Sequence, residues 1–458
     1  MAKAKKKEST LTLEEKLAQA LVPESEQPYK VPKNWCWTYI ASGFDVTSSK
    51  RVHKCDWLTE GIPFYRTREL VKLSESGFVD NELFISEKMF EDFKEAYGVP
   101  KIGDILISGV GTIGVPYVVE ENKKFYFKDG NVIWFRNKGM FIAKYIFYLY
   151  RSLFMINQVY GMSAGTTVDT YTIVNAQSTI LPLPPLAEQQ RIVDRIENLF
   201  AKLDEAKEKL QEVLDSFETR KAAILHKAFT GELTANWREE HGLSLDSWEK
   251  KKLGECGVLE RGKSKHRPRN DERLFGGKYP FIQTGDVASA DVYIVEHKQT
   301  LSEFGLQQSK LFPTGTLCIT IAANIGDVAI LSYDCCFPDS VVGFTPNKDV
   351  SSKFIYYMMR VLQKEIEDNA PATAQKNINL KILNDILVAK PSIEEQCVIV
   401  DIIDEFFEKE KVVKECTLDC LDNVDEIKKA ILARAFRGEL GTNDENDECA
   451  VELLKRVL

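Results

Sequence analysis

Apolar residues recur along two long stretches of the chain at the spacing of a coiled-coil seam. The steps between them are mostly three or four residues, which is typical of a helix that packs lengthwise against another helix. The first set is Ile192, Ile196, Leu199, Leu203, Ala206, Leu210, Val213 and Phe217, and the second is Ile399, Ile402, Phe406, Val413, Cys416, Cys420, Ile427 and Ile431. The first helix is predicted to run unbroken to Gly231, a natural position for a C-terminal cap. Polar Lys409 and Asn423 fall at expected seam positions, where such residues fix register.

The pattern changes between these stretches. Residues 31–180 (the first block) and 244–390 (the second block) hold short β-type runs and frequent glycines, so each is predicted to be a compact, strand-rich α+β domain. Prolines at 182, 184 and 185 are predicted to end the strand pattern of the first block, and Pro391 follows the second. Residues 1–30 are predicted to contain a short helix opened by a Thr12–Glu15 capping box. The helical regions are then 181–243 and 391–440, and 441–458 is predicted to be an acidic linker with a short helix from Ala450.

The chain repeats itself. Ala-Ile-Leu-His-Lys-Ala-Phe-Thr-Gly-Glu-Leu at 223–233 matches Ala-Ile-Leu-Ala-Arg-Ala-Phe-Arg-Gly-Glu-Leu at 430–440, and upstream Trp35 pairs with Trp248. A period near 207 residues is far longer than the roughly 20 to 50 of a solenoid. The pattern indicates a tandem duplication of block and helix.

Charge is distributed unevenly along this repeat. The chain carries −9 overall, yet each block is +1, whereas residues 181–243 carry −3 and 391–458 carry −9. Near-neutral blocks leave room for positive faces, and the acidic helical segments are better suited to protein contacts than to phosphates. Ten scattered cysteines without paired CxxC sets, and no apolar run of about 20 residues, favour a soluble cytoplasmic protein.

Motifs of enzymes and metal sites are weak here. Residues 109–114 read Gly-Val-Gly-Thr-Ile-Gly, the spacing of a dinucleotide fingerprint, but the equivalent residues 321–326 keep only the final glycine. A tight turn near a phosphate fits both copies better, although a nucleotide-binding enzyme stays open as an alternative. Cys416 and Cys420 lie four residues apart and are predicted to pack in the helical seam, and no metal site is expected.

Basic and polar loops occupy corresponding positions in the two blocks. The second block begins with a basic run at residues 261–269, and the first has basic residues at about the same place. Arg and Lys neutralise phosphates, and Arg, Gln and Asn hydrogen-bond base edges. The candidate DNA contacts are Lys50, Arg51, Lys54, Arg66, Arg68, Ser108, Thr112, Ser163, Thr166, Thr167, Arg261, Lys263, Lys265, Arg267, Arg269, Gln283, Thr284, Asn324, Gln375, Lys376 and Asn377.

The order of block, proline break and long helix, twice over, resembles the DNA-specificity subunit of type I restriction-modification systems. The resemblance rests on Leu-Pro-Leu-Pro-Pro-Leu-Ala-Glu-Gln-Gln-Arg-Ile-Val at 181–193, its weaker copy at 391–396, the paired Ala-Phe-x-Gly-Glu-Leu endings, Gly-Asp-Ile-Leu at 103–106 and Tyr-Pro-Phe-Ile-Gln-Thr-Gly-Asp at 279–286. It implies two target recognition domains that read the halves of a bipartite, asymmetric DNA sequence, separated by two helices that pair antiparallel.

The same resemblance implies a non-catalytic subunit of a hetero-oligomer on double-stranded DNA. Two methyltransferase subunits that bind S-adenosylmethionine and methylate adenine N6, and two ATP- and Mg-dependent restriction subunits, would be its partners. No cofactor or membrane is expected for this chain. The second junction departs from the first, with Cys397 following Gln396 where Arg191 follows Gln190, so the two docking surfaces need not be equivalent. A solitary methyltransferase-targeting or anti-restriction protein on the same scaffold is the main alternative.

Overall fold

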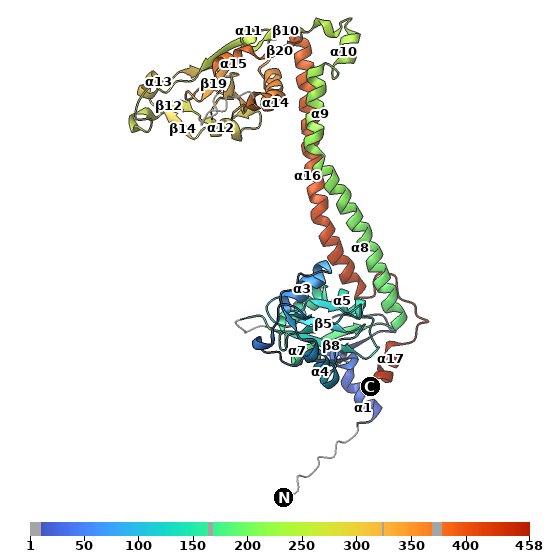
Figure 1. Ribbon diagram of the computed structural model, residues 1–458. Helices are drawn as coiled ribbons and strands as arrows, with labels where there is room; N and C mark the ends of the chain where they lie inside the picture. The colour runs from blue at the N-terminus through green and yellow to red at the C-terminus, as the bar shows by residue number, and fades with distance from the viewer. Residues whose placement is uncertain (1–10, 164–167, 323–324, 369–377) are drawn as a thin grey trace. The chain divides into compact units, whose positions relative to one another are not determined.

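The computed structural model describes residues 11–163, 168–322, 325–368 and 378–458. Two compact units divide the chain: unit 1 comprises Met1–Lys209 with Cys420–Leu458, and unit 2 comprises Leu210–Asp419. Each unit therefore combines one block with parts of both long helical stretches (Figure 1).

The first block folds as three small sheets. Their strand orders are β2-β8-β5-β6, β4-β3-β7 and β1-β9. The strands are β1 (Cys36–Tyr39), β2 (Phe44–Thr47), β3 (Ile62–Tyr65), β4 (Phe84–Ile85), β5 (Ile105–Ser108), β6 (Pro116–Val118), β7 (Tyr126–Phe127), β8 (Val132–Asn137) and β9 (Ile180–Leu183). Helix α1 (Leu13–Ala20) precedes the block, whose helices are α2 (Ile40–Gly43), α3 (Thr67–Ser76), α4 (Glu87–Tyr97), α5 (Ala143–Tyr150), α6 (Leu153–Gly161) and α7 (Ile173–Ser178). Pro182 lies inside β9 opposite Trp37, so the strand runs past the predicted break, which a two-stranded sheet with free edges permits.

The second block repeats this plan with extra edge strands. Its sheets have the orders β11-β19-β16-β17-β13, β14-β12-β18-β15 and β10-β20. The strands are β10 (Glu249–Lys252), β11 (Gly257–Arg261), β12 (Phe275–Phe281), β13 (Tyr293–Ile294), β14 (Gln299–Leu301), β15 (Leu311–Phe312), β16 (Leu317–Thr320), β17 (Val328–Leu331), β18 (Cys335–Cys336), β19 (Val341–Pro346) and β20 (Leu387–Lys390). Helix α10 (Ala235–Glu240) precedes the block, whose helices are α11 (Leu253–Cys256), α12 (Thr284–Ser289), α13 (Glu303–Gln308), α14 (Ser352–Asp368) and α15 (Leu380–Asp385). The predicted duplicated α+β architecture is confirmed.

Three helices follow the blocks: α8 (Leu186–Asp215), α9 (Phe217–Thr230) and α16 (Ile393–Ala435). In unit 1, Lys428 pairs with Asp204 and Lys207 with Asp425, so residue numbers rise on one helix as they fall on the other. The pairing is therefore antiparallel, as predicted. The first helix is not continuous, however, because it is interrupted at Ser216, whose hydroxyl donates to the carbonyl of Val213.

Ile399 of the predicted α16 seam is buried, but from Ile402 onward the register of the seam was predicted one residue out of place. Val413, Cys416, Cys420 and Ile427 are exposed, and so are Lys409 and Asn423. The buried positions are the neighbouring ones, Ile403, Glu410, Thr417, Val424 and Leu432. In unit 2 the seam contains the charged Glu410, which forms an ion pair at 2.7 Å with Arg220 of α9.

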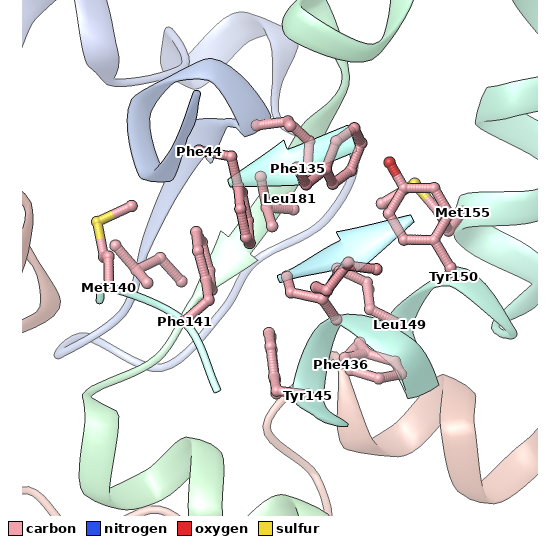
Figure 2. Packing of buried hydrophobic residues seen from close by; sticks show 14 of the residues in the cluster. Phe44, Phe135, Met140, Phe141, Tyr145, Leu149, Tyr150, Met155, Leu181 and Phe436 are labelled. Carbon is pink, nitrogen blue, oxygen red and sulfur yellow. The ribbon is translucent and has the colours of Figure 1, made fainter. Parts of the chain in front are cut away.

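The core of unit 1 includes parts distant in sequence. Phe436, just beyond the end of α16, reaches the aromatic cluster of the first block, where its ring meets Tyr145 at 5.4 Å between centroids (Figure 2). Helix α17 (Ala450–Val457) buries Ala450, Leu453 and Leu454 in the same cluster. The predicted C-terminal helix exists, and it is part of unit 1.

A Glu-Gln pair begins each long helix and binds its block by the same hydrogen bonds. Gln189 of α8 accepts from Ile142 N at 2.8 Å and donates to the carbonyls of Met140 and Pro184, both at 3.1 Å. In unit 2, Gln396 of α16 makes the equivalent three bonds with Ser351, Asp349 and Pro391. These amides fix the proline junction to the block, a role that the sequence motif alone did not reveal.

The two preceding glutamates are buried but have different partners. Glu188 accepts from the Trp35 indole at 2.6 Å, from Asn443 at 2.8 Å and from Thr442 at 3.3 Å, all of them neutral groups. Burial, opposed by these hydrogen bonds, raises the pKa of Glu188. The C-terminal tail thus closes this pocket.

In unit 2 the corresponding carboxylate forms a buried ion pair. Glu395 accepts from the Trp248 indole at 2.9 Å and from Thr234 at 2.7 Å. Its third partner is Arg238 of α10, at 2.6 Å, and both charged side chains are at least nine-tenths buried. The buried glutamate therefore accepts hydrogen bonds from neutral groups in unit 1, whereas in unit 2 it forms an ion pair with an arginine.

The glycine-rich stretch 109–114 forms the turn of a β-hairpin. It joins antiparallel strands β5 and β6, and Gly111 and Gly114 have φ values of 81° and 78°. A Cβ at Gly114 would approach Val159 to 3.0 Å. A dinucleotide fingerprint requires a strand followed by a helix, so the nucleotide-binding interpretation of this stretch loses its structural basis.

Candidate nucleic-acid interface

The basic run of the second block lines a cleft of about 190 Å³. Four residues predicted from the sequence meet there: Lys263, Arg269, Gln283 and Thr284. Polar neighbours that the sequence did not single out are Ser264, His266, Gln308, Ser309 and Ser340. The apolar part of the lining includes Phe275, Phe281 and Leu301. The cleft therefore combines cations, amides and hydroxyls with apolar side chains.

Backbone contacts hold this loop against β18 and β19. Gly262 donates to the carbonyl of Val341 at 2.9 Å and Lys263 N donates to Phe337 at 3.2 Å. A Cβ at Gly262 would lie 2.3 Å from the carbonyl oxygens of Phe337 and Pro338, so only glycine allows this approach. The loop is thereby fixed at its base while its cationic side chains stay exposed.

Asp339 orients two of the arginines. Its carboxylate pairs with Arg269 at 3.0 Å, and its backbone carbonyl accepts from Arg261 Nε at 2.5 Å. Arg267 donates instead to the carbonyls of Ser264 and His266. Lys263 and Lys265 are exposed, and no described carboxylate pairs with either of them. The two lysines are therefore the cations of this loop best placed to neutralise phosphates.

The first block places a shorter basic loop over the equivalent strand. Ser49 donates to the carbonyl of Phe127 at 2.6 Å and Lys50 N donates to the hydroxyl of Tyr126 at 2.9 Å. Arg51 pairs with Asp129 at 2.8 Å, which corresponds to the pairing of Arg269 with Asp339. Lys50 and Lys54 are exposed. The structure thus brings the predicted basic residues of both blocks to the same site of the fold.

The residue before the next helix differs between the blocks within a common hydrogen-bond pattern. In the second block Gln283 N donates to Asp286 at 2.8 Å, and in the first Arg66 N donates to Glu69 at 2.9 Å. Burial opposes ionisation of Glu69, but hydrogen bonds from Arg66 and Arg68 outweigh it and lower its pKa to about 2. Both arginine side chains are therefore held by a permanently charged carboxylate.

Other predicted contacts lie elsewhere. The prediction for Ser108 is corrected, because this residue is fully buried and its hydroxyl accepts from Val115 N at 2.8 Å. Ser163 is also buried and bonds Asp169 at 3.1 Å, so it serves the fold. Thr112 is exposed on the β5–β6 turn. Thr166, Thr167, Asn324, Gln375, Lys376 and Asn377 lie outside the described residues.

His266 is a site residue that the sequence did not reveal. Its Nε2 lies 2.7 Å from Asp271, which also binds Arg273 at 2.7 Å. Hydrogen bonds from Arg273 and His266 lower the pKa of Asp271 well below its usual range. A lone histidine in a basic run carries no spacing signal, so only the fold shows this pairing. Among the described residues no cluster of three or more His, Cys, Asp or Glu is arranged to hold a metal.

A family model described as "Type I restriction modification DNA specificity domain" matches residues 40–215 and 246–415, which is most of the chain. The chain belongs to this specificity family. Both matched regions join a block to the helix that follows it, in agreement with the repeat seen in the structure.

Curated members of the specificity family align over part of their length. The EcoBI specificity subunit of Escherichia coli is 26% identical over 302 residues, which cover 62% of this chain and 63% of that subunit. A putative specificity subunit of Haemophilus influenzae is 33% identical over 159 residues, or 34% of this chain and 38% of that one. This chain therefore spans less than two thirds of either relative in these matches.

The fold extends over solved members as well. The HsdS subunit from Thermoanaerobacter tengcongensis superposes with a TM-score of 0.66 at 20% identity, over 91% of this chain and all of that one. A chain from a structure concerned with complex assembly and conformational transition of the type I R-M system gives 0.58 at 21% identity, over 90% and 100%. Among the described residues, no helix has the length and apolarity needed to span a membrane.

Proposed function

We propose that this chain is the DNA-binding specificity subunit of a type I restriction-modification complex. It recognises a bipartite, asymmetric target, one half with each block, and directs adenine-N6 methylation and restriction by partner subunits. Two methyltransferase subunits bind S-adenosylmethionine, and two restriction subunits use ATP and Mg. The observation that carries the proposal is that one framework, repeated within a member of the specificity family, presents different side chains at the same loop.

These differences suit two readers of different sequences. At the start of the helix after the central strand of the small sheet, the first block has Arg66 and the second has Gln283. Arginine matches the acceptor pair of guanine, whereas glutamine matches the donor and acceptor of adenine. The lysines beside them supply sequence-independent attraction to phosphates. The chain itself needs no reactive group, because the target adenine is flipped into the pocket of a partner.

The decisive test maps methylated adenines genome-wide in a strain with the chain and in a strain lacking it. A bipartite motif that disappears with the chain is expected, and its absence contradicts the proposal. Replacing residues 244–390 with the block of another family member is expected to change one half of the motif only. A plasmid-restriction assay in the same strains separates a restricting complex from a solitary methyltransferase-targeting protein.

A further inference from the structure

Each unit carries the same cluster of side chains where its block meets its long helix. In unit 1 the cluster, here called clamp 1, joins Lys144 and Tyr148 of α5 to Glu197 and Phe200 of α8. Lys144 Nζ lies 2.8 Å from Glu197 Oε1, and the Tyr148 hydroxyl lies 3.5 Å from the same oxygen. The Tyr148 ring meets the edge of Phe200 at 5.9 Å and 88°.

Clamp 2, in unit 2, joins Lys353 and Tyr357 of α14 to Asp404 and Phe407 of α16. Lys353 Nζ and the Tyr357 hydroxyl each lie 2.5 Å from one oxygen of Asp404. The Tyr357 and Phe407 rings meet at 5.6 Å and 84°. Residue types and the pairing of elements are thus repeated, with Asp replacing Glu, whereas the phenol contact is longer in clamp 1, where both donors face one oxygen.

The polar contacts of the clamps restrict the angle between block and helix more than they stabilise the fold. Half-exposed ion pairs such as Lys144–Glu197 contribute little to stability, because solvent screens them. The opposite face of α5 packs Tyr145, Ile146 and Leu149 into the core, and that contact depends little on angle. A lysine and a phenol converging on one carboxylate depend strongly on angle.

A cleft adjoins each clamp, next to the apolar packing of Ile192, Val193 and Ile196 of α8 in unit 1 and of Ile399, Val400 and Ile403 of α16 in unit 2. A cleft of about 330 Å³ adjoins clamp 1 and one of about 640 Å³ adjoins clamp 2. Burial raises the pKa of both Tyr148 and Tyr357, so both phenols remain hydrogen-bond donors at neutral pH. At the cleft the clamp is therefore a directional polar contact between block and helix, in addition to the buried apolar packing and the hydrogen bonds of Gln189 and Gln396.

We propose that clamps 1 and 2 are positioning clusters that fix the angle at which each block leaves its helix, and thereby the half-site spacing that the chain accepts. This inference rests on the proposed function. A block of about 150 residues has a radius of gyration near 15 Å. A sphere with this radius of gyration is about 39 Å across, so a swing of about 5° at the root of the block moves its far side by roughly one base-pair rise, about 3.4 Å.

The test uses the full chain copurified with its methyltransferase. The probes are duplexes that carry the methylated site mapped for the wild type, with the native spacer or a spacer one base pair longer or shorter. The variants are Tyr148→Phe with Glu197→Gln, and Tyr357→Phe with Asp404→Asn. Glu205→Gln and Glu405→Gln are matched controls, because these residues form exposed pairs with Lys209 and Lys409 on the same helices.

We expect the clamp variants to lose at least fivefold of the wild-type preference for the native spacer, while affinity for the native duplex falls less than threefold. The controls should keep the preference. If a carboxylate variant fails to fold, the Tyr→Phe variants alone, which keep the ring contacts, give the same comparison.

Unchanged spacer preference, or an equal loss of affinity for all three duplexes, overturns the clamp assignment and leaves the proposed function standing. Failure of the wild-type complex to prefer any duplex overturns the proposed function, and the clamp assignment with it.

Discussion

The same Glu→Gln substitution should have very different effects on stability in the two duplicated glutamate pockets. In Glu188→Gln, the amide oxygen can accept from both Trp35 and Asn443, which now share Glu188 Oε2. The amide nitrogen then faces the hydroxyl of Thr442, which can accept as well as donate. Every bond survives, so we expect a change in stability below about 1 kcal/mol.

In Glu395→Gln, no orientation of the amide keeps all of the hydrogen bonds. Arg238 and Thr234 both donate to one carboxylate oxygen and Trp248 donates to the other, so either orientation of an amide sets a donor against a donor. The buried Arg238 also loses its counter-ion. Removing one member of a buried ion pair costs about 3 to 5 kcal/mol, and we expect unit 2 to lose that much.

Native-state hydrogen exchange measures the opening free energy of each unit separately, through the amides of β1 in unit 1 and β10 in unit 2. Equal losses from the two substitutions, within about 1 kcal/mol, would refute the reasoning. The pH dependence adds a second check. Because the pKa of Glu188 is raised in the folded state, wild-type unit 1 should gain stability relative to Glu188→Gln as pH falls through that raised pKa, with the full gain below 4.5.

Three further predictions test the interface, the tail and the helical seam. Lys263→Ala should remove about one phosphate contact, so the slope of log binding constant against log salt concentration, measured for the complex on DNA, should change by about 0.9. Lys202→Ala, on the exposed face of α8, should leave that slope unchanged. Equal slopes in the two variants contradict the proposed interface. Leu454→Ala should destabilise unit 1 by about 2 to 5 kcal/mol, measured by hydrogen exchange against Glu452→Ala, and no difference would mean that α17 is not part of the core. Cys416 and Cys420 are exposed and should react with a thiol reagent in the native protein. Cys318 and Cys335, whose thiol pKa values are raised by burial, should react only on unfolding. Protection of Cys416 and Cys420 in the native protein would mean that they pack in the helical seam, as predicted from the sequence.

The sequence pattern predicted the repeat, the fold class and the helices, because these depend on periodicity and local signals such as the Gly231 cap. It failed where two apolar stripes run side by side on α16. Phe406 stands beside Phe407 and Cys420 beside Leu421, so spacing alone permits either register. The contacts made with α8 and α9 decide it, and these are long-range.

Which candidate contacts lie close together in the fold could not be read from the sequence. Lys263 and Gln283 lie 20 positions apart, and only the pairing of β12 with β18 brings their loops to one cleft. Ser108 ends a strand covered on both faces, which a short apolar run does not distinguish from a half-exposed strand. The partners of Glu188 and Glu395 lie more than 140 residues away, so their motifs were visible but their bonds were not.

The composition of the two units bears on how the protein is made. Unit 2 is complete once Asp419 has been synthesised, whereas unit 1 requires Cys420–Leu458, which carry Phe436, Thr442 and α17. At about 5 to 20 residues per second, the first block waits on the ribosome for roughly 10 to 50 s with part of its core uncovered. The half that is translated first is therefore finished last, and its apolar surface is the part of the nascent chain most in need of a chaperone.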